Sequence, residues 1–381
     1  MNNELYIGLD VHSEAVVVAV AEGGRSGEVR DHGSISNDVR ILEKLVARLR
    51  KTHGADVKLR FCYEAGPCGF GIARKFKQMG IECMVVAPSK IPVRSGDRVK
   101  TDRRDAAKLA RLLRAGELTA VYVPDPTDEA IRDMCRARTD AVDDARRNRC
   151  RLKAFLLRHG YHYRVNTHWG DAHLRFLRGL ALAHPAMKAI LEEYLCAIEF
   201  AAERITRCEA SMAALLEGWP LKPAVEAVMT MRGFEMVAAM IVVSELGDIH
   251  RFDHPRQLMG YLGLVSRERT SSTRRRQGAI TKTGNPHLRW LLIESAQHYA
   301  LAPKVSRALS KRQEGQCREV LQLSWKAQNR LHHRFTRLVA RRLQRNKALV
   351  AVARELCGFL WAVLQTQTCY VQQSRELKSA A

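Results

Sequence analysis

The segment LYIGLDV at residues 5–11, with HSE at 12–14 and AVVVAVAE at 15–22, decides the fold of the first part of this chain. Both apolar stretches are rich in β-branched side chains and a short polar turn separates them, so they predict a β-hairpin. The stretch EVRDHGSIS at 28–36 predicts a third strand. Together the three strands predict an antiparallel meander.

Helix and strand signals then alternate as far as about residue 125. Residues 37–54 carry apolar side chains at helical spacing, with Asn37 or Asp38 as the expected N-cap. An antiparallel meander followed by alternating helices and parallel strands is the order of an α/β fold of the ribonuclease-H-like type. The further elements are predicted as a strand at 57–65, a helix at 69–80, a strand at 81–88, a helix at 101–116 and a short strand at 119–124.

Four acidic side chains are predicted to converge in this region. Asp10 ends the first strand and Glu64 ends the fourth, and these two strands are neighbours in a ribonuclease-H-like sheet. Asp102 and Asp105 stand on one face of the first turn of a helix. Four carboxylates in a basic surround can hold two Mg²⁺ ions, with Mn²⁺ as an alternative, for work on a phosphodiester.

Each of these acids also has a purely structural interpretation. Asp10 could simply begin a turn. Asp102 and Asp105 satisfy the spacing of a capping box, with Asp102 as N-cap and Asp105 at the third helical position. Glu64 is the hardest to explain structurally, because it would leave a charge at the end of an apolar strand.

The rest of the chain is predicted to be mainly helical. Residues 126–217 contain two long amphipathic helices, one up to about Arg158 and one that starts at Pro185. They predict either an antiparallel coiled-coil stalk or a helical subdomain packed on its own chain. Residues 218–368 form a second globular region, and 369–381 a frayed tail. The segment 229–248 is predicted as helix, glycine turn, helix, a weak likeness to the phosphate-gripping helix-hairpin-helix.

A serine pair stands in a basic stretch of the second region. Ser271 and Ser272 are predicted to lie in a loop, and on chemistry alone ordinary loop serines are the favoured explanation. An alcohol nucleophile needs a base or a metal ion, and neither is visible nearby in the sequence. The residues expected to contact nucleic-acid phosphates are Lys100, Arg103, Arg104, Arg274, Arg275, Arg276, Lys282 and Arg289, the last two around a helix capped by Thr283 or Asn285.

Composition favours a nucleic-acid partner. The chain of 381 residues has 63 Lys and Arg against 40 Asp and Glu, a formal net charge of +23. The excess is clustered at 90–114, 265–289 and 311–347, so binding should weaken steeply with salt. The 10 cysteines form no CxxC pair and the start shows no signal peptide, which predicts reduced thiols in a cytosol. Polar residues are expected to interrupt apolar stretches before they reach membrane-spanning length.

These motifs together resemble the insertion-sequence transposases of the one-ten family, which are related to Piv-type DNA invertases. Those enzymes pair a RuvC-like DEDD domain with a C-terminal serine domain. The resemblance runs through nearly the whole chain, and its motifs are specific jointly rather than singly. They are GLDVHSE at 8–14, YEAGPCGFG at 63–71, KTDRRDAAKLARLLR at 100–114, RGFEMVAAMIVVSELGDIHRF at 232–252, LMGYLGLVSRERTSS at 258–272 and RRRQGAITKTGNPHLRWLLIESA at 274–296.

The resemblance implies that Asp10, Glu64, Asp102 and Asp105 bind the metal ions. It also implies that a serine forms a transient covalent link to DNA. The family usually has serine followed by glycine, which aligns with Ser271 and Ser272, so Ser271 is assigned as nucleophile and Ser272 remains the alternative. Members use a non-coding bridge RNA to choose donor and target DNA. They act as homodimers that pair into tetramers, in which the metal domain of one subunit can meet the serine domain of another.

Three other functions compete with this one. A RuvC-like nuclease would use the same acids with water as the nucleophile. A sugar-kinase or actin-like ATPase also opens with such a hairpin, but it would need a second glycine-rich phosphate hairpin, which the sequence lacks at the expected place. A nucleic-acid-binding protein without catalysis would explain the charge alone.

Overall fold

The computed structural model describes residues 4–24, 27–92, 101–165, 169–271 and 274–380, without the side chains of Arg274, Arg275 and 368–380. The chain divides into two compact units, Met1–Pro124 and Asp125–Ala381. Each unit has its own core, and each is described by itself.

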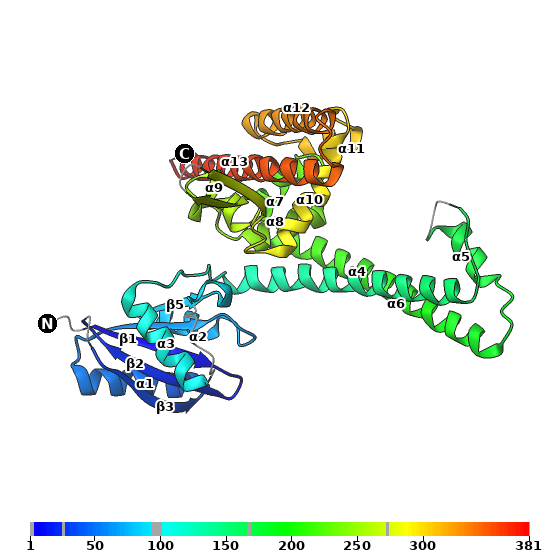
Figure 1. The fold of residues 1–381 in the computed structure, drawn as a ribbon. Helices are drawn as coiled ribbons and strands as arrows, with labels where there is room; N and C mark the ends of the chain where they lie inside the picture. The colour runs from blue at the N-terminus through cyan, green and yellow to red at the C-terminus, as the bar shows by residue number, and fades with distance from the viewer. Residues whose placement is uncertain (1–3, 25–26, 93–100, 166–168, 272–273, 381) are drawn as a thin grey trace. The chain divides into compact units, whose positions relative to one another are not determined.

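The first unit is built on one mixed five-stranded sheet with the order β3-β2-β1-β4-β5 (Figure 1). Its antiparallel meander pairs β2 with both β1 and β3, and its parallel half pairs β4 with both β1 and β5. This arrangement confirms the predicted α/β topology, including the adjacency of the first and fourth strands. The strands are β1 (Glu4–Val11), β2 (Ala15–Glu22), β3 (Val29–Ser36), β4 (Lys58–Glu64) and β5 (Glu82–Val86).

Helices cover both faces of this sheet. Helices α1 (Val39–His53) and α2 (Gly71–Gln78) pack on one face, where Leu9 and Phe61 are fully buried. Helix α3 (Asp102–Ala115) packs on the other face and ends at Gly116, whose φ of 70° is the left-handed conformation that glycine adopts without strain. Asp38 caps α1 by accepting a hydrogen bond from the amide of Arg40, which settles the predicted choice of N-cap.

The short strand predicted at 119–124 is wrong. This segment forms an isolated bridge between Ala120 and Val86 instead of a strand, and the Val121 amide donates to the Val85 carbonyl. The guanidinium of Arg74 donates to the carbonyl of Pro124 at 2.9 Å, so a side chain of α2 holds the end of the segment. That contact takes the chain off the sheet edge before a ladder can form. The turn Pro88–Lys90 is a short 3-10 helix, η1.

Two long helices open the second unit, close to their predicted bounds. They are α4 (Pro126–Arg158) and α6 (Pro185–Gly218), which pack side by side over most of their lengths (Figure 1). Between them lies α5 (Asp171–Arg178), which the sequence does not predict. Leu177 of α5 is fully buried against Leu152 of α4 and Leu191 of α6, so the connection has a small core of its own.

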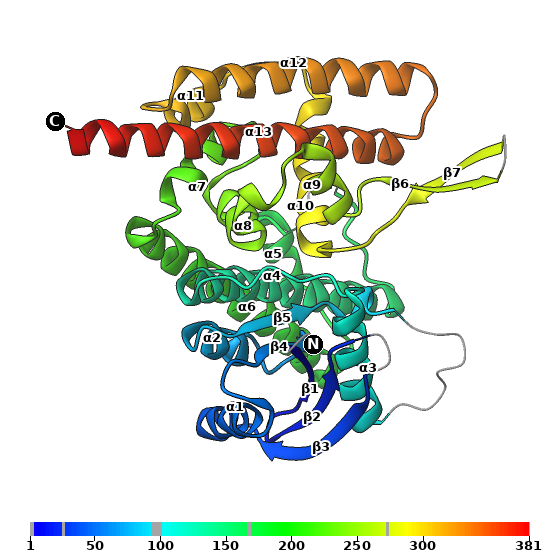
Figure 2. The same cartoon turned by 90° about the vertical axis from the view of Figure 1, so that its left-hand side faces the viewer.

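The remainder of the unit is mainly helical around one large core. The predicted helix, glycine turn and helix are confirmed: α7 (Lys222–Met229) leads through Gly233, at φ 87°, into α8 (Met236–Leu246). The other helices are η2 (Ile249–Arg251), α9 (Pro255–Tyr261), α10 (Pro286–Ala296), η3 (Gln297–Ala300), α11 (Arg307–Gln313), α12 (Arg318–Ala340) and α13 (Arg345–Ala380). Strands β6 (Ser266–Ser271) and β7 (Arg274–Ile280) form a separate antiparallel ribbon, which projects from these helices (Figure 2).

Helix α13 bears on two expectations. Its residues Arg345–Gln367 are long and apolar enough, by length and composition, to cross a membrane, although Arg354 and Glu355 interrupt the apolar stretch as the sequence predicts. Half of that apolar window is buried in the unit, where Val352 and Leu356 join the core, and soluble core helices pass the same test. The helix also runs on through 369–380, predicted as a frayed tail, because Gln, Glu, Leu, Lys and Ala are good helix formers.

Candidate metal centre and serine ribbon

The sheet places Asp10 and Glu64 on the same face. Strands β1 and β4 are parallel, and Leu9 pairs with Tyr63 as the last partners of the ladder. Asp10 and Glu64 are the next residues along each strand. Paired residues of neighbouring strands point to the same side of a sheet, and successive residues alternate between sides. Leu9 and Tyr63 are buried on the side of α1 and α2, so the two carboxyl-bearing residues belong to the side of α3.

Helix α3 begins beside these strand ends. It crosses β1 closely at Gly8, and its first residue is Asp102. The N-cap is Thr101, whose hydroxyl accepts a hydrogen bond from the Arg104 amide at 3.4 Å. The predicted capping role of Asp102 is therefore wrong, because the extended backbone of Thr101 places that residue one position earlier, where its own side chain can cap. Asp102 is left at the first position of the helix, where its carboxylate is not needed as a cap.

His12 joins Asp10 and Asp102 in one cluster. Its Nε2 lies 3.3 Å from an Asp10 carboxylate oxygen and 3.6 Å from an Asp102 carboxylate oxygen. One donor atom from each residue lies within 4.8 Å of the others, a spacing that a single cation could span. Glu64 and Asp105 are not members of this group. Sequence reasoning missed His12, although a metal-ligating side chain two residues after Asp10 in the hairpin turn was a usable signal.

The electrostatics of Asp10 suit a cation. Burial raises the pKa of this carboxyl, and the negative charges of Asp102 and Asp105 raise it further, while His12 acts in the opposite direction. A positive charge at this point would favour the ionised carboxylate. Hard carboxylate oxygens are the preferred ligands of Mg²⁺ and Mn²⁺. The donor set therefore fits a divalent metal ion.

Ser271 lies in a strand, which corrects the predicted loop. It is the last residue of β6 and pairs with Arg274 of β7, because β6 and β7 continue their ladder almost to the serine pair. Ser272 lies outside the described residues. Arg269 pairs with Arg276, two positions from Ser271 along the ladder. Since side chains two apart share a face, Ser271 and Arg269 lie on one face of the ribbon, and Arg276 lies on it too. Sequence reasoning missed Arg269, which the alternation of a strand would have revealed.

The remaining basic residues predicted to bind nucleic acid fall into different settings. Arg276, Lys282 and Arg104 are exposed. Arg103 forms an ion pair with Asp31 at 3.2 Å. The Arg289 guanidinium donates to the carbonyls of Leu262 at 3.0 Å and Thr283 at 2.8 Å, which gives it a structural use. Lys100 lies outside the described residues, and Arg274 and Arg275 are described by backbone alone.

Comparison with known proteins finds two transposase families, which match separate parts of the chain. Residues 7–160 match the family DEDD_Tnp_IS110, described as "Transposase", and residues 225–311 match "Transposase IS116/IS110/IS902 family". The first match contains the carboxylates and His12. The second contains the ribbon with Ser271.

Full-length relatives extend these matches. A putative transposase of Sinorhizobium fredii, y4qE, is 42% identical over 364 residues, which are 94% of this chain and 88% of the relative. The transposase for insertion sequence element IS1533 of Leptospira borgpetersenii is 29% identical over 90% of this chain and 99% of its own length. The transposase for insertion sequence element IS1111A of Coxiella burnetii is 25% identical over 78% of this chain and 75% of its own length.

A mixed α/β unit with clustered carboxylates, a helical unit with a serine ribbon, and relatives matched along nearly their whole length lead to one conclusion. The chain belongs to the IS110/IS116/IS902 family of transposases, enzymes of DNA cleavage and strand transfer with an N-terminal DEDD domain.

Proposed function

We propose that this transposase cuts and rejoins DNA with two sets of groups, a divalent-metal site in the first unit and the hydroxyl of Ser271 in the second. Residues 1–125 would be the RuvC-like catalytic domain, 126–217 a helical stalk, 218–368 the serine transposase domain and 369–381 a tail. The observation that carries the proposal is that Asp10 and Asp102, which are far apart in the sequence, both lie next to His12.

The metal site would be formed by Asp10, Glu64, Asp102 and Asp105. Asp10 and Asp102 belong to one cluster of possible metal ligands, and Glu64 is on the same side of the sheet as Asp10. The negative charge of Asp105 raises the pKa of Asp10. Two bound Mg²⁺ or Mn²⁺ ions would supply Lewis-acid stabilisation to the attacking and leaving oxygens of a phosphodiester. The carboxylates would hold and orient these ions, and the basic surround would hold the DNA backbone.

The strand-cutting step would be a displacement at phosphorus. The Ser271 oxygen forms a bond to phosphorus, the bond from phosphorus to the leaving deoxyribose oxygen breaks, and the serine proton passes through a base to that oxygen. A hydroxyl end of another strand then attacks the same phosphorus, the bond from phosphorus to the Ser271 oxygen breaks, and the proton of that hydroxyl passes back to the serine. Bond energy is conserved in the covalent link, so no ATP is required. Arg269 and Arg276 share the face of Ser271 and suit the phosphate during transfer.

The partners would be donor and target DNA, together with a non-coding bridge RNA that selects them. The net charge of +23 supports contact with two long polyanions. Homodimers that pair into tetramers would assemble partly through α4 and α6, acting as a coiled-coil stalk. Exposed apolar side chains on these helices, such as Leu157 and Phe200, support such an interface. The enzyme would work in the bacterial cytosol, at the nucleoid.

The test is detection of the covalent protein–DNA adduct after denaturation. Ser271→Ala should abolish adducts and recombination while DNA affinity stays within about twofold, and Ser272→Ala should retain both. Asp10→Ala should abolish cleavage. Normal recombination by Ser271→Ala would overturn the serine mechanism.

The same assay distinguishes the second candidate, a nuclease that shares the carboxylates and uses water. Its Ser271→Ala variant would still nick DNA and would leave free ends without attached protein. Sequencing the RNA that copurifies with the tagged protein tests the bridge RNA, since a recurrent transcript from the flanks of the gene is expected.

A further inference from the structure

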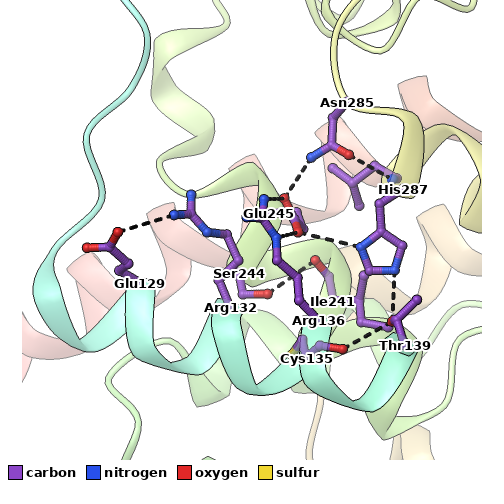
Figure 3. A network of polar contacts seen from close by, with 11 residues as sticks. Glu129, Arg132, Cys135, Arg136, Thr139, Ile241, Ser244, Glu245, Asn285 and His287 are labelled. Carbon is purple, nitrogen blue, oxygen red and sulfur yellow. Dashed lines mark hydrogen bonds and ion pairs between the residues drawn. The ribbon is translucent and has the colours of Figure 1, made fainter. Parts of the chain in front are cut away.

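A buried carboxylate, Glu245, lies at the centre of a polar network in the second unit (Figure 3). Its side chain is 2% exposed. Arg136 of α4 donates to both carboxylate oxygens, at 2.7 and 3.0 Å, in the bidentate geometry that gives the strongest charged hydrogen bonds. Asn285 donates at 2.7 Å, and Nδ1 of His287 lies 3.5 Å away.

The network keeps Glu245 ionised. Burial alone would raise the pKa of this carboxyl, but hydrogen bonds from His287, Arg136 and Asn285 outweigh it and lower the pKa to about 2. A buried ion pair seldom adds net stability over an apolar pair of the same size, although removing one partner is strongly destabilising. The arrangement is better explained by the specific geometry that it imposes on its partners.

Glu245 and its partners come from three separate helices. Glu245 is near the end of α8, and Arg136 belongs to α4. Asn285 is the N-cap of α10, where its side chain also accepts a hydrogen bond from the Leu288 amide. Nε2 of His287 lies 3.1 Å from the hydroxyl of Thr139, one turn further along α4 (Figure 3). The carboxylate therefore ties the start of α10 to both α8 and α4.

The start of α10 is also the base of the serine ribbon. We call residues 261–265 and 281–285, which flank β6 and β7, the ribbon base. Its two segments are in tight contact: a β-carbon at Gly284 would lie 1.7 Å from the Tyr261 carbonyl oxygen, and one at Gly263 would lie 2.4 Å from that of Thr283. The Lys282 amide donates to the Gly263 carbonyl at 3.1 Å. Such a base transmits its orientation to the strands that leave it.

We infer that Glu245 is a positioning residue for strand transfer, because it fixes the direction of the ribbon that carries Ser271. The inference rests on the proposed role of that serine. Six strand residues span about 20 Å, so a tilt of about 10° at the ribbon base moves the serine by about 3 Å. A displacement of about 1 Å can cost a hundredfold in rate when reacting atoms must align. Glu245 itself does not touch the DNA in this arrangement; it acts through Asn285 and His287.

The experiment compares Glu245→Gln with Glu235→Gln in the full-length enzyme. The control removes a carboxylate at the opposite end of the same helix α8, where Glu235 is 82% exposed and 3.4 Å from Arg312. In Glu245→Gln, the single-turnover rate of covalent adduct formation should fall about a hundredfold, with DNA affinity within about twofold. Hydrogen exchange at the Thr281 and Lys282 amides, which bond across the ribbon base, should quicken at least tenfold. Glu235→Gln should change none of these quantities.

The outcomes separate the two hypotheses. A normal adduct rate in Glu245→Gln would overturn the positioning role, whatever Ser271→Ala does. Adducts in Ser271→Ala would instead overturn the proposed nucleophile. Should Glu245→Gln fail to fold, Arg136→Lys decides, because it keeps the charge and loses the bidentate geometry. That variant should form the covalent adduct about tenfold more slowly, and an unchanged rate would refute the inference.

Discussion

Gly8 of β1 lies directly beneath Ala106 of α3, so closely that a β-carbon at Gly8 would come within 2.2 Å of the Ala106 carbonyl oxygen. Backbone atoms cannot yield as a flexible side chain can. Gly8→Ala should therefore push α3, and with it Asp102, away from Asp10. We expect a loss of about 3 kcal/mol in the free energy of unfolding of the first unit and a weaker affinity for Mn²⁺.

Circular dichroism during urea unfolding measures this loss. All 5 tryptophans lie beyond residue 168, so their fluorescence reports on the second unit and should be unchanged. Gly71→Ala is the matched control, because nothing lies within 4 Å of a β-carbon at Gly71. Equal stability of Gly8→Ala and the wild type would show that α3 can shift without cost.

His12 should contribute to metal affinity without being indispensable. Its imidazole lies within reach of the same cation as Asp10 and Asp102, so His12→Ala should raise the Kd for Mn²⁺ by about tenfold. Asp102→Asn should raise it further, because it removes a charged ligand. Isothermal titration calorimetry in the absence of DNA measures both. An unchanged Kd in His12→Ala would show that His12 contacts the two carboxylates without binding the metal ion.

The order of the first unit was predictable because its signals are local. β-Branched stretches such as Val16–Val20 and the helical spacing of Leu42, Leu45 and Leu49 each describe one element, and the known order of such elements implies the sheet. The failure at 119–124 has a tertiary cause, the hydrogen bond from Arg74 to Pro124. Likewise α5 exists because Leu177 finds a core between the two helices that flank it, α4 and α6.

Glu245 gives the second unit a specific sensitivity to acid. Its folded-state pKa of about 2 lies below the ordinary 4.5, so the folded protein binds this proton less readily than the unfolded chain. The stabilisation is complete above pH 4.5 and is lost as the pH falls towards 2. It should amount to about 3 kcal/mol. Tryptophan fluorescence during urea unfolding at several pH values measures it, and Glu245→Gln should lack this contribution.

Arg276 and Arg289 should differ in their effects although both were predicted to bind phosphates. Arg276 is exposed on the ribbon, so Arg276→Ala should reduce the slope of log affinity for DNA against log salt by about 1. Arg289→Ala should leave that slope unchanged and cost about 2 kcal/mol of stability, because two backbone carbonyls lose their donor. Equal salt slopes for the two variants would contradict this distinction.

The site was only partly predictable, because several of its residues depend on contacts between segments that are far apart in the sequence. Asp10 and Asp102 could be proposed as partners because strand and helix ends are visible in the sequence. His12, Arg269 and Glu245 acquire their roles from pairing in space, through a turn geometry, a strand register and a three-helix contact. The type of a residue does not indicate which of these contacts it will make. Arg289 shows the reverse case, since its charge suggested a ligand and the fold uses it as a hydrogen-bond donor to backbone carbonyls.

The pairing of β6 with β7, which is regular from Glu268 to Ser271, constrains how the length of this ribbon can change. Adding one residue to each strand at the ribbon base would turn the face that carries Arg269 and Ser271 to the opposite side of the ribbon. Adding two to each would keep this face on its own side and carry it outward by about 7 Å. The reach of the enzyme is therefore quantised, and related transposases that differ in reach should differ by even numbers of residues per strand.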